Sequence, residues 1–281
     1  MESGDPLVTA EWLKEHISAP DVRVVDATWF PPFLNPEKTG RQAWAEGHIP
    51  GAVYFDIDAI KAGGTDLPHM LPDPVMFSSR ARKLGLGDGN RIIVYDQFNF
   101  FASARVWWML RVMGQRDVKV LDGGLKAWTD AGGEIEDLPP VAVERHFTAR
   151  VRSDLLKDSD QMLAASANSS HNIIDSRSAE RFSGEAPEPR EGLPSGHIPG
   201  SICLPSGELR TEDGRMKSAE ELGKLFPNPL APTIATCGSG VSAAVTALAL
   251  ARLGNWDVAV YDGSWAEWAS DASRPVATGT A

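Results

Sequence analysis

Short runs rich in valine and isoleucine alternate along the chain with longer segments of helical character. Each short run has the length and continuous apolar character of a buried strand, and the longer segments read as helices. The strand-like runs lie within residues 22–30, 91–96, 118–128, 171–182, 232–237 and 258–268, and the clearest helical segments are 77–87, 103–114 and 243–254. This alternation predicts an α/β protein with parallel sheets that carry helices on both faces.

Four of these patterns occur twice, in the same order, about 140 to 150 positions apart. The clearest is Gly-His-Ile-Pro-Gly, at residues 47–51 and 196–200. The other three are the strand-like runs that contain Asp26 and Asp175, Asp96 and Cys237, and Asp122 and Asp262. Four ordered matches indicate a duplicated domain. A segment rich in Gly, Pro and charge, residues 132–146, marks the linker, and we expect domains at 1–138 and 139–281.

Four polar residues recur in both copies: Asp26 with Asp175, and His48 with His197. They occur in the copy that has no cysteine at its strand end as well as in the copy that has one. Recurrence in both halves indicates a structural role, such as tying a loop or capping a strand end.

Cys237 stands where a predicted strand meets a predicted helix in the second half, the position at which parallel sheets bind ligands. Small residues follow it, so successive backbone N–H groups can turn inward, and the helix starting near Val241 adds the positive end of its dipole. Both effects favour a nucleophilic thiolate. The alternative is a buried structural cysteine, which is our interpretation of Cys203. The first copy carries Asp96 and bulkier residues at this place, so only one half is expected to be catalytic.

The paired Gly-His-Ile-Pro-Gly motifs, the Asp-Gly strand ends followed by tryptophan and the cysteine loop in the second half resemble the tandem rhodanese family of sulfurtransferases. The likeness covers residues 7 to 270 and implies two rhodanese-like domains. The loop Cys-Gly-Ser-Gly-Val-Ser-Ala is similar to that of the 3-mercaptopyruvate branch and departs from it only by Ser242 for threonine. It implies a persulfide on Cys237 and a substrate loop formed by Gly238, Gly240, Val241 and Ser242.

Two arginines, Arg181 and Arg190, lie nine positions apart on a long predicted loop. They match the arginines that bind substrate in the mercaptopyruvate branch. Mercaptopyruvate is a monoanion whose carboxylate needs a cationic fork at a distance from the thiolate. Thiosulfate is a compact dianion, and the thiosulfate-using branch carries cationic residues inside the loop, where this chain has none.

Three more residues are implied by the resemblance to form a proton relay. Asp58 and His69 match an Asp and a His of the first domain that act with the loop serine, here Ser239. Such a relay would assist proton transfer around the substrate thiol and carbonyl. From the sequence alone, a histidine in a proline-rich loop is as readily a structural hydrogen-bonding group.

The composition limits the kinds of molecule that the protein is expected to bind. The net charge of −11 and the pI near 5.0 argue against nucleic acid and anionic membranes. Two cysteines without an apparent export signal indicate a reducing cytoplasm. No metal-ligand spacing, phosphate loop or dinucleotide fingerprint occurs, so we expect no metal and no cofactor. The expected partners are 3-mercaptopyruvate as sulfur donor and a small thiol, a reduced thioredoxin-like protein or cyanide as acceptor.

Three alternatives stay open at this point. The chain could be a thiosulfate sulfurtransferase or a non-catalytic rhodanese-like binding module. A cysteine-loop phosphatase is disfavoured, because such enzymes need an arginine six positions after the cysteine, where this chain has Ala243. The sequence does not identify the acceptor, the oligomeric state or the biological purpose.

Overall fold

Two parallel sheets form the framework of the computed structural model, which describes residues 4–34, 36–98 and 100–280. Among these residues, each sheet has five strands, in the orders β1-β5-β4-β2-β3 and β6-β10-β9-β7-β8. The two orders are the same when the strands of each domain are numbered from its start. Every neighbouring pair is parallel. The predicted α/β fold with a duplicated domain is therefore confirmed.

The first domain runs from β1 to α5. Its strands are β1 (Leu7–Val8), β2 (Val22–Asp26), β3 (Val53–Tyr54), β4 (Arg91–Tyr95) and β5 (Val118–Leu121). Its helices are α1 (Ala10–His16), α2 (Gly40–Glu46), α3 (Pro74–Lys83), α4 (Phe101–Val112) and α5 (Gly124–Asp130), with the 3-10 turn η1 (Pro32–Leu34).

The second domain repeats this plan. Its strands are β6 (Leu156–Lys157), β7 (Asn172–Asp175), β8 (Ser201–Cys203), β9 (Thr233–Thr236) and β10 (Ala259–Tyr261). Its helices are α6 (Ser159–Asn168), α7 (Ala179–Ser183), α8 (Ala219–Leu225), α9 (Ala243–Arg252) and α10 (Ser264–Trp268), with the 3-10 turns η2 (Ser153–Leu155) and η3 (Ser206–Leu209).

Strand residues face the two sides of each sheet in alternation, as the pleat requires. In β4, Ile92 and Val94 pack on the side of α3 and α4, whereas Ile93 and Tyr95 pack on the side of α1 and α5. The helices thus cover both faces, and each outer face has its own apolar cluster.

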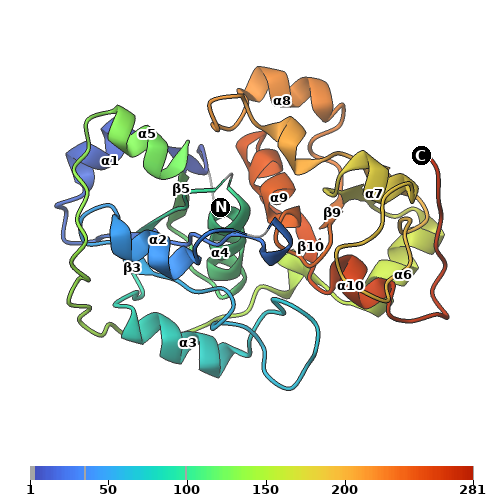
Figure 1. Ribbon diagram of the computed structural model, residues 1–281, viewed down its shortest axis with the longest axis horizontal. Helices are drawn as coiled ribbons and strands as arrows, with labels where there is room; N and C mark the ends of the chain where they lie inside the picture. The colour runs from blue at the N-terminus through green and yellow to red at the C-terminus, as the bar shows by residue number, and fades with distance from the viewer. Residues whose placement is uncertain (1–3, 35, 99, 281) are drawn as a thin grey trace.

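The inner faces of both sheets share one apolar core, in which α4 packs against α9. Figure 1 shows these two helices side by side in the middle of the molecule, with the first domain in blue and green on the left and the second in yellow to red on the right. All residues of α4 from Ala102 to Val112 are buried. The domains are therefore held by a continuous hydrophobic interface, which fixes loops of one domain against the other.

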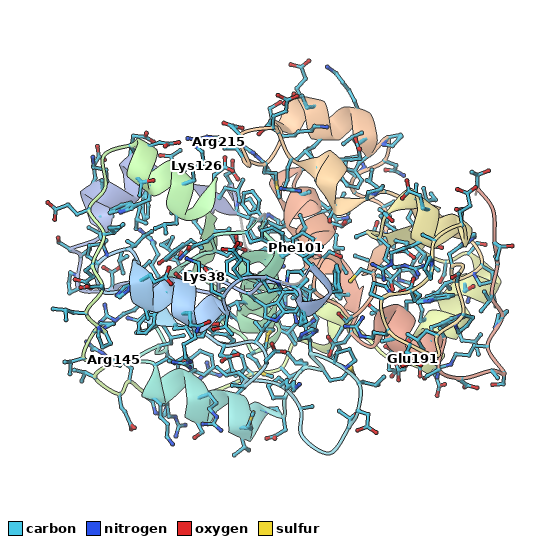
Figure 2. All side chains as sticks on the ribbon, viewed as in Figure 1. Lys38, Phe101, Lys126, Arg145, Glu191 and Arg215 are labelled. Atoms are coloured by element: carbon cyan, nitrogen blue, oxygen red, sulfur yellow. The ribbon has the colours of Figure 1, made fainter. Side chains whose placement is uncertain are left out.

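In each domain, the aspartate of the repeated Asp-Gly motif also binds a loop of the other domain. Asp122 Oδ1 accepts a hydrogen bond from the backbone of Met216 at 2.9 Å, and Asp262 Oδ2 accepts one from the backbone of Leu71 at 2.6 Å. Figure 2 labels Lys126 and Arg215 close to each other at the upper edge, where the loop before α8 approaches α5. The Asp262 contact brings the loop between β3 and α3 to the second domain.

The repeated histidines secure the chain that follows the last helix of each domain. His48 forms an antiparallel bridge with Glu136, and His197 forms one with Ala277. Each ring stacks on an aromatic side chain, His48 on Trp44 and His197 on Phe182. Residues 131–152 connect the two domains and lie along the first, for example through the hydrogen bond from Arg150 N to Met113 O. Within the described residues, no helix has the length and apolar character to cross a bilayer.

Candidate active site

The cysteine loop leaves β9 and is fastened to the first turn of α10. The Cys237 carbonyl accepts from Trp265 N at 2.9 Å, and the Gly238 carbonyl accepts from Ala266 N at 3.0 Å. The Cys237 amide donates to Ser264 Oγ at 3.2 Å. Cys237 is 2% exposed and lies at the carboxyl end of the central strand. The backbone on each side of the sulfur is therefore held rigidly.

The amide groups of residues 238–242 donate to no acceptor in the part of the chain that the structure describes. Helix α9 begins at Ala243 after the cap residue Ser242, as the helical segment 243–254 predicts, and adds the positive end of its dipole. Gly240 has a φ of +74°, and a Cβ there would lie 2.7 Å from the Asp262 carbonyl. This loop is consequently a cradle for negative charge that only glycine can complete at position 240.

The first domain fills the corresponding cradle with its own side chain. The Asp96 carboxylate accepts hydrogen bonds from the amides of Phe98, Phe100 and Ser103 at 3.0, 3.3 and 2.8 Å. Burial raises the pKa of this carboxyl. Because an internal carboxylate accepts from these three amides, they are not available to an external anion.

Arg181 and Arg190 converge on Gly238 from the end of α7 and the loop that follows it. A Cβ at Gly238 would lie 3.0 Å from Arg181 Nη2 and 3.7 Å from Arg190 Nη1. Two guanidinium groups therefore stand directly beside the residue that follows Cys237.

A buried glutamate, which we did not identify from the sequence, holds Arg181 in this place. Glu188 accepts from Arg181 Nη2 through one carboxylate oxygen and from Arg177 Nη1 at 2.7 Å through the other. Arg177 also pairs with Asp175 at 2.6 Å and lies over the ring of Trp265. The only signal in the sequence was an acidic residue two positions before Arg190. Three guanidiniums and two carboxylates leave this cluster with one net positive charge.

Arg190 supplies that unbalanced charge. Its guanidinium donates to no protein acceptor among the residues described. Burial lowers the pKa of Arg190, and the nearby Cys237 sulfur opposes that shift. A half-buried guanidinium without a carboxylate partner among the described residues is poised to bind an anionic ligand next to the sulfur.

Ser239, His69 and Asp58 form a connected chain across the two domains. His69 Nδ1 lies 3.3 Å from Ser239 Oγ, and His69 Nε2 lies 3.1 Å from Asp58 Oδ1. The other Asp58 oxygen accepts from Trp29 Nε1 at 2.8 Å. Asp58 thus favours the tautomer that carries the proton on Nε2 and leaves Nδ1 to accept from the serine.

The pKa shifts of His69 and Asp58 favour a neutral His69 imidazole. Burial lowers the pKa of His69, while the Asp58 carboxylate partly opposes the shift. The hydrogen bond from His69 lowers the pKa of Asp58 in return. A neutral histidine beside an ionised aspartate can take a proton from Ser239 near neutral pH.

The structure brings the candidate catalytic and substrate-binding residues together around the cysteine loop. Val241 is 3% exposed and its side chain packs into the shared core, so this residue can contribute to the cradle only through its backbone. Cys203 lies at the end of the edge strand β8, with its sulfur 3.8 Å from the Arg177 carbonyl, and burial raises its pKa to about 11 and keeps it as a thiol. In the described ranges, no three His, Cys, Asp or Glu side chains form a group suited to a metal ion.

The chain matches the Rhodanese-like domain twice, over residues 9–131 and 158–271. It is 41% identical over 273 residues to the 3-mercaptopyruvate sulfurtransferase of Escherichia coli K12, an alignment that covers 96% of each chain. It is 39% identical over 275 residues to the thiosulfate sulfurtransferase of Gallus gallus, covering 94% of this chain and 93% of the relative.

The same likeness is found among solved structures. The crystal structure of SseA from Escherichia coli, described as a 3-mercaptopyruvate sulfotransferase, superposes with a TM-score of 0.85 at 39% identity and covers 93% of this chain and 99% of SseA. The Tum1 protein of Saccharomyces cerevisiae superposes with a TM-score of 0.88 at 29% identity, covering 98% of each chain. Both domains and their mutual arrangement are thus shared with these proteins.

Proposed function

This chain belongs to the rhodanese family, and from that premise we propose that it is a 3-mercaptopyruvate sulfurtransferase that carries the transferred sulfur on Cys237. The observation that supports this most is the meeting of Arg181 and Arg190 at the residue beside Cys237. A second support is the Asp58–His69–Ser239 chain, which ends on the same loop. The anion-binding arginines, the nucleophilic cysteine and the proton relay therefore all meet at the loop that begins at Cys237.

In the first half-reaction, the substrate carboxylate binds the guanidinium groups and its thiol lies against Cys237. The Cys237 thiolate attacks the substrate sulfur, a sulfur–sulfur bond forms, and the carbon–sulfur bond breaks. The bonding electrons remain on carbon as the enolate of pyruvate. The proton of the substrate thiol is passed by Ser239, with His69 as its base, and restores the methyl group. No external oxidant or reductant is required.

In the second half-reaction, an acceptor removes the outer sulfur. A thiolate or cyanide attacks that sulfur, the sulfur–sulfur bond breaks, and Cys237 leaves as a thiolate. The unpaired amides of residues 238–242 and the dipole of α9 stabilise that leaving thiolate. A small thiol or a reduced thioredoxin-like protein would serve as acceptor.

The charge of the site favours a monoanionic donor. The cluster of Arg177, Arg181, Arg190, Asp175 and Glu188 has one net positive charge, which the Cys237 thiolate balances before the donor binds. Thiosulfate, a dianion, would bring one more negative charge than mercaptopyruvate into this partly buried place, at a greater cost in desolvation.

Thiosulfate remains the second candidate donor, because the relative from Gallus gallus is named as a thiosulfate sulfurtransferase. Steady-state kcat/KM values with both donors and one acceptor test the choice. We expect mercaptopyruvate to be the better donor, and a higher kcat/KM with thiosulfate would reverse the assignment.

The proposed compartment is the cytoplasm. Both cysteines are free in the structure, and a catalytic cycle through a cysteine thiolate needs a reducing environment. Fractionation of the native cells would test this proposal directly.

A further inference from the structure

A buried arginine of the domain without the cysteine reaches the active-site loop of the other domain. Arg105 lies on α4 with none of its side chain exposed. Its Nη1 donates to Gly240 O at 3.2 Å and to Asp262 Oδ1 at 2.6 Å, and its Nη2 donates to the carbonyl of His69. One guanidinium therefore contacts the cysteine loop, the loop before α10 and the relay loop.

These contacts lie on both sides of the longest contact in the relay, between His69 and Ser239. Gly240 follows Ser239 directly, and the His69 carbonyl belongs to the residue whose ring faces Ser239 at 3.3 Å. His69 also has a φ of +58°, a strained conformation for a residue with a side chain. A local tether is needed to keep such a backbone in place, and Arg105 supplies it.

The supporting contacts leave Arg105 little freedom. Its guanidinium carbon lies 4.5 Å from the centre of the Trp108 ring, and the second oxygen of Asp262 accepts from Leu71 N at 2.6 Å. The same aspartate thus binds the relay loop directly and through Arg105. A planar fork suits this geometry, because a lysine ammonium cannot span acceptors on separate loops with fixed angles.

We propose that Arg105 is a positioning residue of the sulfur-transfer reaction, which sets Ser239 and His69 at hydrogen-bonding distance by holding Gly240 and His69 on one guanidinium. The kinetic test of this inference rests on the proposed function, because it measures turnover of mercaptopyruvate. It also assigns an active role to the domain that lacks the cysteine.

The test compares Arg105→Lys with Arg111→Lys, a matched control. Arg111 is equally buried on the same helix, lies over Trp107 and Trp256, and donates to Trp256 O, away from the cysteine loop. Arg105→Lys should lower kcat for mercaptopyruvate by about a hundredfold, because a small misplacement of catalytic groups has that effect. The KM should stay within about threefold, because Arg181 and Arg190 are untouched.

A second variant guards against misfolding. Arg105→Met combined with Asp262→Asn leaves no uncompensated buried charge and still lets residue 262 accept from Leu71 N. It should also lose kcat while Arg111→Lys keeps it. Wild-type kcat in either folded variant would overturn the proposal. Failure of both to fold while Arg111→Lys folds would also overturn it, since Arg105 would then be a folding residue.

The pKa of His69, measured by NMR, provides a readout that does not depend on activity. Asp58, Arg105 and Arg190 are charged groups around this ring, with Asp262 paired to Arg105, and Arg105 lowers the pKa of His69. Arg105→Met removes this cation and leaves Asp262 ionised, so it should raise the His69 pKa relative to both wild type and Arg111→Lys. An unchanged value would overturn the inference even if the wild-type protein proved inactive with mercaptopyruvate, an outcome that would refute the proposed function alone.

Discussion

His69 Nδ1 lies 3.3 Å from Ser239 Oγ, although 170 positions separate the two residues and they belong to different domains. The contact exists because α4 and α9 pack together and bring the loop after β3 against the loop after β9. The domain without the cysteine therefore provides two of the three relay residues, and sulfur transfer should depend on residues of both domains.

The relay should behave as one unit. Ser239→Ala and His69→Asn should each lower kcat by about a hundredfold or more, the range usual for general acid–base groups. The double variant should be little worse than either single one, because each change breaks the same proton path. The measurement is a double-mutant cycle on kcat with mercaptopyruvate. Strictly additive losses would show that the two side chains act independently.

The pH dependence of donor turnover should follow from the burial of His69. Burial lowers its pKa from the ordinary value of 6.5, and protonated His69 cannot accept from Ser239. The kcat/KM for mercaptopyruvate should therefore rise with pH as His69 loses its proton, with a midpoint below pH 6.5.

Titration of the His69 ring by NMR provides the direct check. Because the Asp58 carboxylate raises the pKa of His69, Asp58→Asn should lower it further. A His69 pKa above 6.5 in the wild type, or a rise in the Asp58→Asn variant, would contradict this account of the site.

Substrate anchoring should depend on the unpaired guanidinium. Arg190→Gln should raise the KM for mercaptopyruvate, with a loss of about ten- to hundredfold in kcat/KM, the value of one charge-assisted hydrogen bond. Arg145→Gln is a suitable control, because Arg145 is exposed on the outer side of the first domain, as Figure 2 shows. A wild-type KM in the Arg190 variant would remove this residue from the binding site.

The sequence predicts which residues belong to this site but not how they meet in space. The duplicated motifs predict two equivalent sheets, and the strand-to-helix position of Cys237 predicts a binding loop. Arg181, Arg190, Asp58 and His69 could be named because their positions match a known family pattern. Their convergence on Gly238 and Ser239 becomes visible only in the folded chain.

The supporting residues escaped prediction for a physical reason. Arg105 and Glu188 act by tertiary hydrogen bonds to partners 135 and 7 positions away, which leave no periodic trace in the sequence. The available hint for Arg105 was its place on an otherwise apolar helix, which it shares with Arg111, since a buried charge must have partners.

Donor choice should respond to charge placed inside the loop. Ser239→Lys adds a cation beside Cys237 and removes the serine of the relay. The ratio of kcat/KM values should shift toward thiosulfate by at least about tenfold, equivalent to about 1.4 kcal/mol. Gly238→Arg is a poorer test, because a side chain there meets Arg181 Nη2 at once. If folded Ser239→Lys keeps the wild-type preference, the loop does not determine the donor.

The central claim is that Cys237 carries the sulfur, and mass spectrometry of the protein after exposure to mercaptopyruvate tests it most directly. Wild type and Cys203→Ser should each gain one sulfur on the peptide that contains Cys237, and a thiol acceptor should remove it. Cys237→Ser should gain none, because an alcohol neither abstracts sulfur nor holds it as a persulfide. Sulfur on the Cys203 peptide, or donor turnover by Cys237→Ser, would contradict the account.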